Sequence, residues 1–174
     1  TLAVSNDCGN DARTMTITVY APVAASFSAA PTLGVEPMCV DFTSTSTGDI
    51  SSYDWILGNG DMSHDANPSA VMYSAGTYDV SLTVAGSGGD SSTDNQVGVI
   101  TALAVGDCNA DGSIDTADPI FSANYLFGGG AAPACERTCD VNGDTNHDLG
   151  DVIYGLTYLF ATGPAPVAAA PCSG

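Results

Sequence analysis

The sequence predicts a mainly β protein that ends in a small α-helical domain. Three observations predict this fold class. Short runs that alternate apolar and polar residues fill positions 24–101, and turn residues separate them at the spacing of an antiparallel β-sandwich. An acidic segment, Asp107–Asp118, returns 33 residues later as Asp140–Asp151, and an apolar helical pattern follows each copy. Residues 1–20 have the pattern of a separate β-hairpin.

In this N-terminal hairpin, Leu2–Val4 and Met15–Tyr20 are expected to be strands, and residues 6–11 form the turn. The two strands align with residues 82–85 and 94–99, so the segment looks like the last hairpin of a preceding sandwich. A lone hairpin is marginal in water. Two interpretations stay open: a leftover end of a truncated sandwich, or a hairpin that completes a sheet in a neighbouring molecule. The expected domains are 1–20, 21–103 and 104–174.

The central region contains a series of short strands. They are expected at residues 25–28, 38–43, 52–57, 70–73, 77–84 and 94–100. Trp55 is the only Trp and lies in the middle of one of them, so we expect it at the centre of the core.

Two segments of this region resemble a PKD domain, an Ig-like β-sandwich. They are Ser52–Gly60 (SYDWILGNG) and Tyr73–Val84 (YSAGTYDVSLTV). Ile56 and Asn59 stand where the usual family motif has Asp. The resemblance implies a spacer, adhesion or assembly module of secreted proteins, without catalysis.

The repeated acidic segments have the spacing of calcium loops. Both place oxygen-bearing side chains at positions 1, 3, 5, 9 and 12, and position 7 adds a backbone carbonyl. The expected Ca²⁺ ligands are Asp107, Asn109, Asp111, Ser113, Asp115 and Asp118 in the first loop, and Asp140, Asn142, Asp144, Asn146, Asp148 and Asp151 in the second. Position 6 needs a sharp turn that Gly112 allows and Thr145 does not, so we expect a more strained, weaker second site.

Each loop leads into a predicted helix, at Pro119–Phe127 and Val152–Phe160, with Tyr-Leu-Phe at the same place in both. The spacing of Tyr125, Phe127, Tyr158 and Phe160 favours a place in the core, with exposure of some of them to a partner as the alternative. With Asp rather than Glu at position 12, residues 105–172 resemble a dockerin domain. That resemblance implies two bound Ca²⁺ ions, an extracellular setting and calcium-dependent docking onto a cohesin.

The charge balance narrows the expected partners. The chain of 174 residues has a net charge of −18, no Lys, and only Arg13 and Arg137 as cationic residues. Such a surface repels nucleic acid and anionic membranes, and no apolar run reaches the roughly 18 residues that cross a bilayer. With no signal-peptide pattern, we expect the mature form of a secreted bacterial protein.

The six cysteines are expected to form disulfides rather than a zinc site. They are Cys8, Cys39, Cys108, Cys135, Cys139 and Cys172. Of the 15 pairings that six cysteines allow, we expect Cys135–Cys139, Cys108–Cys172 and Cys8–Cys39, although the last pair fits an intermolecular bridge equally well.

No group of residues suggests catalysis. His64 and His147 lack a neighbouring nucleophile motif, and Glu36 and Glu136 lie in expected loops. Two functions remain. The first is an extracellular, calcium-binding assembly protein that binds itself head to tail in a surface layer or filament. The second is the C-terminal anchoring fragment of a larger secreted polysaccharide-degrading enzyme that docks onto a cohesin-like protein.

Overall fold

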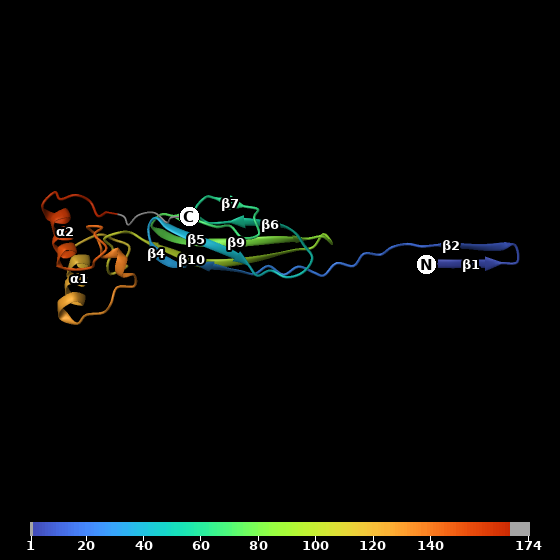
Figure 1. The fold of residues 1–174 in the computed structure, drawn as a ribbon, viewed down its shortest axis with the longest axis horizontal. Coiled ribbons are helices and arrows are strands. Elements are labelled where there is room, and N and C mark those ends of the chain that lie inside the picture. Colours follow the sequence, from blue (N-terminus) through green and yellow to red (C-terminus); the bar gives the residue numbers. More distant parts are fainter. Residues whose placement is uncertain (1, 168–174) are drawn as a thin grey trace.

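A computed structural model describes residues 2–167 as a hairpin, a sandwich and a two-helix module that follow one another along the molecule (Figure 1). The hairpin comprises β1 (Leu2–Asn6) and β2 (Gly9–Arg13). The sandwich comprises β3 (Phe27–Ala30), β4 (Leu33–Val35), β5 (Met38–Ser44), β6 (Ile50–Ile56), β7 (Met62–Ser63), β8 (Val71–Tyr73), β9 (Gly76–Gly86) and β10 (Ser91–Leu103). The module comprises α1 (Ala117–Gly128), a 3-10 turn η1 (Glu136–Thr138) and α2 (Leu149–Phe160). This architecture confirms the expected fold class.

Two sheets make the sandwich. One has the strand order β4-β10-β9-β6-β7, and the other has the order β3-β5-β8. All pairs are antiparallel except β10 with β4, where Thr101 pairs with Leu33 in parallel. The strands β4 and β7 were not expected, because runs of three and two residues are too short to show a period-two pattern.

Trp55 lies at the centre of the core, as expected, and is fully buried. The rings of Phe27 and Phe42 pack on it at centroid distances of 5.1 and 5.5 Å. The indole Nε1 donates a hydrogen bond to the carbonyl of Asp65 at 2.8 Å, and the Tyr73 hydroxyl donates to the carbonyl of Leu57 at 2.7 Å. The polar ends of the large aromatic side chains are therefore satisfied inside the core.

The N-terminal hairpin differs from its expected form. The second strand is β2 at Gly9–Arg13 and not Met15–Tyr20. The Asn6 side chain accepts a hydrogen bond from the Cys8 amide at 2.8 Å, so the chain turns within two residues and β2 pairs at once with β1. Residues 15–19 are extended, and Figure 1 shows β1 and β2 apart from the sandwich at the end of this segment.

The two-helix module is joined to the sandwich by a small apolar cluster. Val35 of β4 packs with Val105 and Val141, and Tyr154 of α2 and Cys135 pack against them. The Gly106 amide also donates to the carbonyl of Thr138 at 2.8 Å. The cluster and this hydrogen bond together hold the start of the first acidic loop beside β4 and η1. Among the described residues, no helix has both the length and the apolar character needed to cross a membrane.

Candidate calcium loops

The two acidic segments fold as loops that lead directly into helices, as the sequence predicted. Asp118 lies in the first turn of α1, and Asp148 caps α2. The Asp148 side chain accepts from the Gly150 amide, while the Asp151 side chain accepts from the Asp148 amide, which makes a capping box. The same carboxylates that are candidate ligands therefore also begin the second helix.

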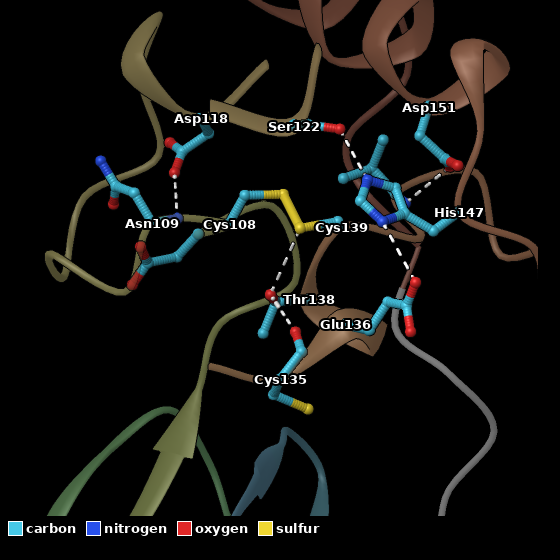
Figure 2. Close-up of a disulfide and its surroundings, with 12 residues drawn as sticks. Cys108, Asn109, Asp118, Ser122, Cys135, Glu136, Thr138, Cys139, His147 and Asp151 are labelled. Carbon is cyan, nitrogen blue, oxygen red and sulfur yellow. Dashed lines mark hydrogen bonds and ion pairs between the residues drawn. A yellow bond between two sulfur atoms is a disulfide. The ribbon is translucent and has the colours of Figure 1, made fainter. Parts of the chain in front are cut away.

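In the first loop, the carboxylates at positions 1 and 12 are buried and hold the loop backbone. Asp107 and Asp118 are 3% and 2% exposed. Asp107 accepts hydrogen bonds from the amides of Asp111 and Gly112, both at 3.0 Å. Asp118 accepts from the amides of Asn109 at 3.2 Å and Asp115 at 2.8 Å, and Figure 2 shows Asp118 facing Asn109. The chain thus wraps around these two carboxylates.

The second loop repeats this network 33 positions later. Asp151 accepts from Asn142 and Asp148 at 3.3 and 2.9 Å, as Asp118 does in the first loop. Asp140 accepts from the Thr145 amide at 3.0 Å, as Asp107 does from Gly112. In both loops the amide at position 7 donates to position 5 at 2.9 Å, from Ser113 to Asp111 and from Asn146 to Asp144. Asp115 also has its counterpart in Asp148, since each accepts the amide two residues further on.

One buried oxygen breaks the equivalence. Oδ1 of Asp140 is buried and has no hydrogen-bond partner among the described residues, whereas Oδ1 of Asp107 accepts from Asp111. An unpaired buried carboxylate oxygen is costly in the absence of a cation. It is the kind of oxygen that a hard divalent ion binds.

The two loops place different residue types at their left-handed positions. Position 6 is left-handed in both, at Gly112 (φ 88°) and Thr145 (φ 76°). Position 4 is also left-handed, at Ala110 (φ 60°) and Gly143 (φ 73°). Each loop therefore has one glycine and one strained residue, which the sequence analysis did not foresee. The β-branched Thr145 is the more costly of the two non-glycine residues, so the expected order of strain is kept.

Burial raises the pKa of Asp118 and of Asp151, because the dry surroundings disfavour the charged carboxylate; nearby Asp107 and Asp140 add to this effect. By contrast, hydrogen bonds from the Asn146 amide and from neighbouring side-chain amides lower the pKa of the exposed Asp144. Both loops thus carry a buried carboxylate whose charge the protein alone does not stabilise well.

As the loops stand, no group of three or more His, Cys, Asp or Glu side chains among residues 2–167 is arranged to hold a metal ion. A calcium site in these loops also needs the side-chain oxygens of Asn109 and Asn142 and the position-7 carbonyl. The buried oxygen of Asp140 and the two wrapped loops fit such a hard, oxygen-binding ion, once the outer carboxylates turn inward.

The loops are tied to each other by a disulfide that the sequence analysis did not predict. Cys108 and Cys139 are bonded, with their Cα atoms 5.1 Å apart, and both are buried (Figure 2). The expected pairs Cys108–Cys172 and Cys135–Cys139 are therefore wrong. A Cys8–Cys39 bridge within the chain is also wrong, because Cys8 is a free thiol, while a bridge between two chains stays a prediction. Cys172 lies outside the described residues.

The physical reason for the error is that packing, and not chain proximity, brings the loop starts together. Cys108 follows the first residue of loop one, the buried Asp107, and Cys139 precedes the first residue of loop two, Asp140, whose Oδ1 atom is buried. Closing the 31-residue separation limits the entropy of the unfolded chain by about 3–4 kcal/mol.

His147, which follows position 7 of the second loop, links that loop to the first helix. Its Nε2 lies 2.7 Å from Oγ of the buried Ser122 in α1, and its ring stacks on Tyr125 with centroids 5.7 Å apart. Nδ1 lies 3.7 Å from a carboxylate oxygen of Glu136 (Figure 2). No local sequence pattern marks this contact between loop two and α1, so it was not expected.

The two helices leave equivalent apolar side chains on the surface. Ile120 and Ile153 are 63% and 56% exposed, and Phe127 and Phe160 are 68% and 70% exposed. The expectation that the two Phe side chains belong to the core is wrong, because α1 and α2 bury only a few residues against each other and the loops. Four large apolar side chains are thus exposed at matching positions of the two helices.

The two packed sheets form an Ig-like β-sandwich, and a small two-helix module with the two acidic loops follows it. Residues 20–102 match the family model described as the PKD domain. This part of the chain is a PKD domain.

The chain spans only a small part of the curated relatives that it matches. A stretch of 63 residues is 43% identical to the pre-pro-metalloprotease PrtV of Vibrio cholerae serotype O1; it covers 36% of this chain and 7% of that protein. The crystal structure of the PKD1 domain of PrtV is 36% identical and covers 47% of this chain and 98% of that one, with a TM-score of 0.40. The PKD1 domain of Vibrio anguillarum Epp is 27% identical and covers 49% and 99%, with a TM-score of 0.41.

Proposed function

We propose that this chain is a non-catalytic, extracellular assembly module in which a PKD sandwich acts as a spacer and a dockerin-like pair of calcium loops acts as the docking unit. The observation that supports it best is the repeated hydrogen-bond network, with the position-12 carboxylate buried in both loops, Asp107 buried in the first, and an unpaired buried oxygen on Asp140 in the second. Two Ca²⁺ ions, one in each loop, would neutralise these carboxylates. The binding energy would then be part of the folding energy.

The docking surface in this proposal is the apolar face of the two helices. The helices expose Ile120, Phe127, Ile153 and Phe160, and the first turn of each helix contains the last residues of a loop. Loss of calcium would therefore loosen the helix starts and the docking surface together. The Cys108–Cys139 disulfide suits an oxidising, extracellular setting.

The first form of this function is self-assembly, in which copies bind head to tail and build a filament or surface layer. Electron microscopy of the protein in Ca²⁺ and in EGTA tests it. We expect filaments or sheets in Ca²⁺ that dissociate in EGTA. Separate particles under both conditions at high protein concentration would reject self-assembly.

The second form is an anchoring portion of a larger secreted enzyme that docks onto a cohesin-like protein. The match to PrtV favours it, because that relative carries a similar domain within a much longer protease. A cohesin panel immobilised on a sensor tests this form with the same protein. Binding that needs Ca²⁺ and is lost in Phe127→Asp with Phe160→Asp would support it, while a Met62→Asp variant, which alters an exposed residue on the sandwich, serves as the matched control.

A further inference from the structure

We propose that residues 2–19 are the last two strands of a second PKD-type sandwich, and that they fit a partner segment folded like strands β3 to β8. The proposal concerns the N-terminal hairpin and the repeat it belongs to. It does not rest on the calcium loops, so it is tested independently of the proposed function.

The N-terminal hairpin aligns without gaps with part of the sandwich. Residues 1–20 align with residues 81–100, which contain most of β9 and the first part of β10. The identical pairs are Leu2 with Leu82, Val4 with Val84, Gly9 with Gly89 and Val19 with Val99. Both glycines have positive φ, at 152° and 90°, a conformation that favours glycine. The turns themselves differ, because Asn6 pairs with Gly9 in the free hairpin and Ala85 pairs with Ser91 in the sandwich.

Equivalent side chains of the two hairpins differ in burial. Val84 is fully buried in the sandwich, and Val99 packs against its core. Their equivalents Val4 and Val19 are 62% and 85% exposed. The same side chains thus occupy a core in one copy and solvent in the other, which indicates that the hairpin lacks the opposing sheet. Ile17 adds nothing to this argument, because its equivalent Val97 is 77% exposed within the sandwich itself.

The two hairpins also differ in the register of their strands. Val84 pairs with Ser92 in the sandwich, so the equivalent partner of Val4 is Ala12; in the free hairpin Val4 pairs with Asp11 instead. A shift of one residue turns each side chain to the other face. The free hairpin has no core that would fix the register, so its two-residue turn decides it. Docking is expected to restore the pairing of Val4 with Ala12.

The strands that surround β9 in this chain indicate which segment would pack on the N-terminal hairpin. β9 pairs with β6, and the β3-β5-β8 sheet covers Val84. A second copy of this chain does not offer that place, because its own β9 and β10 fill it. Since β3 to β8 precede β9 here, we place the equivalent strands on the same polypeptide, N-terminal to Leu2. Covalent linkage then gives the high effective concentration that a small interface needs.

The test uses the full chain, extended by a copy of its own residues 21–80 placed before Thr1. Trypsin reports the result, because Arg13 and Arg137 are the only cleavage sites in the chain and the copy adds none. Arg13 lies at the end of β2 with an 87% exposed side chain. We expect cleavage at Arg13 to slow at least about tenfold in the extended chain, since protection follows the population of the closed state. Cleavage at Arg137 should not change.

Two further chains make the outcome decisive. Val4→Asp in the extended chain should abolish the protection, because the charge would enter the new core. A chain extended by residues 21–100, which carries its own β9 and β10, shows that the copied block folds in front of Thr1. If that control folds and Arg13 is still cut as fast as in the unextended chain, the proposal is wrong. Concentration-dependent protection of Arg13 in the unextended chain would show donation to a neighbour and overturn the placement on the same polypeptide.

Discussion

Replacing Asp118 by Ala is expected to unfold the first loop and α1. The carboxylate accepts two backbone hydrogen bonds, from Asn109 and Asp115, and such bonds to a charged group are worth about 1.5–3 kcal/mol each. Their loss costs about 3–6 kcal/mol. At a Ca²⁺ concentration a hundred times the dissociation constant, loss of the ion adds about 2.7 kcal/mol. This sum is comparable to the whole stability of a small domain, about 5–15 kcal/mol.

The assay is far-UV circular dichroism at 222 nm during thermal unfolding, in Ca²⁺ and in EGTA, because helices occur only in this module of the described chain. Asp54→Ala on β6, whose side chain is 61% exposed, is the matched control and should unfold like the parent protein. An Asp118→Ala variant with the parent's helical signal and the same response to EGTA would refute the reasoning.

Three further predictions follow from the same structure. Thr145→Gly removes a β-branched residue from a left-handed position and should tighten calcium binding at the second loop about fivefold, or about 1 kcal/mol; calorimetric titration of the parent protein that finds two equal sites would contradict the premise. In EGTA, the raised pKa of Asp118 and Asp151 means that these two buried carboxyls bind protons more tightly in the folded module than in the unfolded chain, so their contribution to stability is greatest at low pH and falls as pH rises through the raised pKa values. The helical melting temperature should then be lower at pH 7 than near pH 4.5, and Ca²⁺ should remove the difference; a melting temperature that rises with pH in EGTA would argue against this. Trp55→Ala should cost about 3–5 kcal/mol of sandwich stability in urea unfolding, and a loss below about 1 kcal/mol would mean that the residue is not the core centre.

The two acidic loops were the part of the molecule most open to prediction from sequence. Their ligand spacing is local, so the order of Asp, Asn and Gly along twelve residues already specifies which amides meet which carboxylates. The loop network and the helix starts follow that order. Predicting them needed no knowledge of any distant residue.

Features that depend on distant contacts were predicted less well. The bond between Cys108 and Cys139 depends on how two loops pack, and no spacing of cysteines encodes that. The exposure of Phe127 and Phe160 depends on how much of each helix the module covers, although their helical spacing is the same in either case. The strand at Gly9–Arg13 depends on a turn that competes with the longer hairpin expected from the apolar alternation.

The sequence by itself determined the sandwich, its central Trp55, the two acidic loops and the repeat in the first twenty residues, because hydrophobic period, turn residues and ligand spacing are local properties of the chain. Only the tertiary structure decided which cysteines pair, that His147 joins the second loop to α1, and which of two equivalent valines is buried. Those outcomes depend on contacts between segments far apart in the chain, and a side chain's burial is set by the sheet opposite it and not by its own neighbours in sequence.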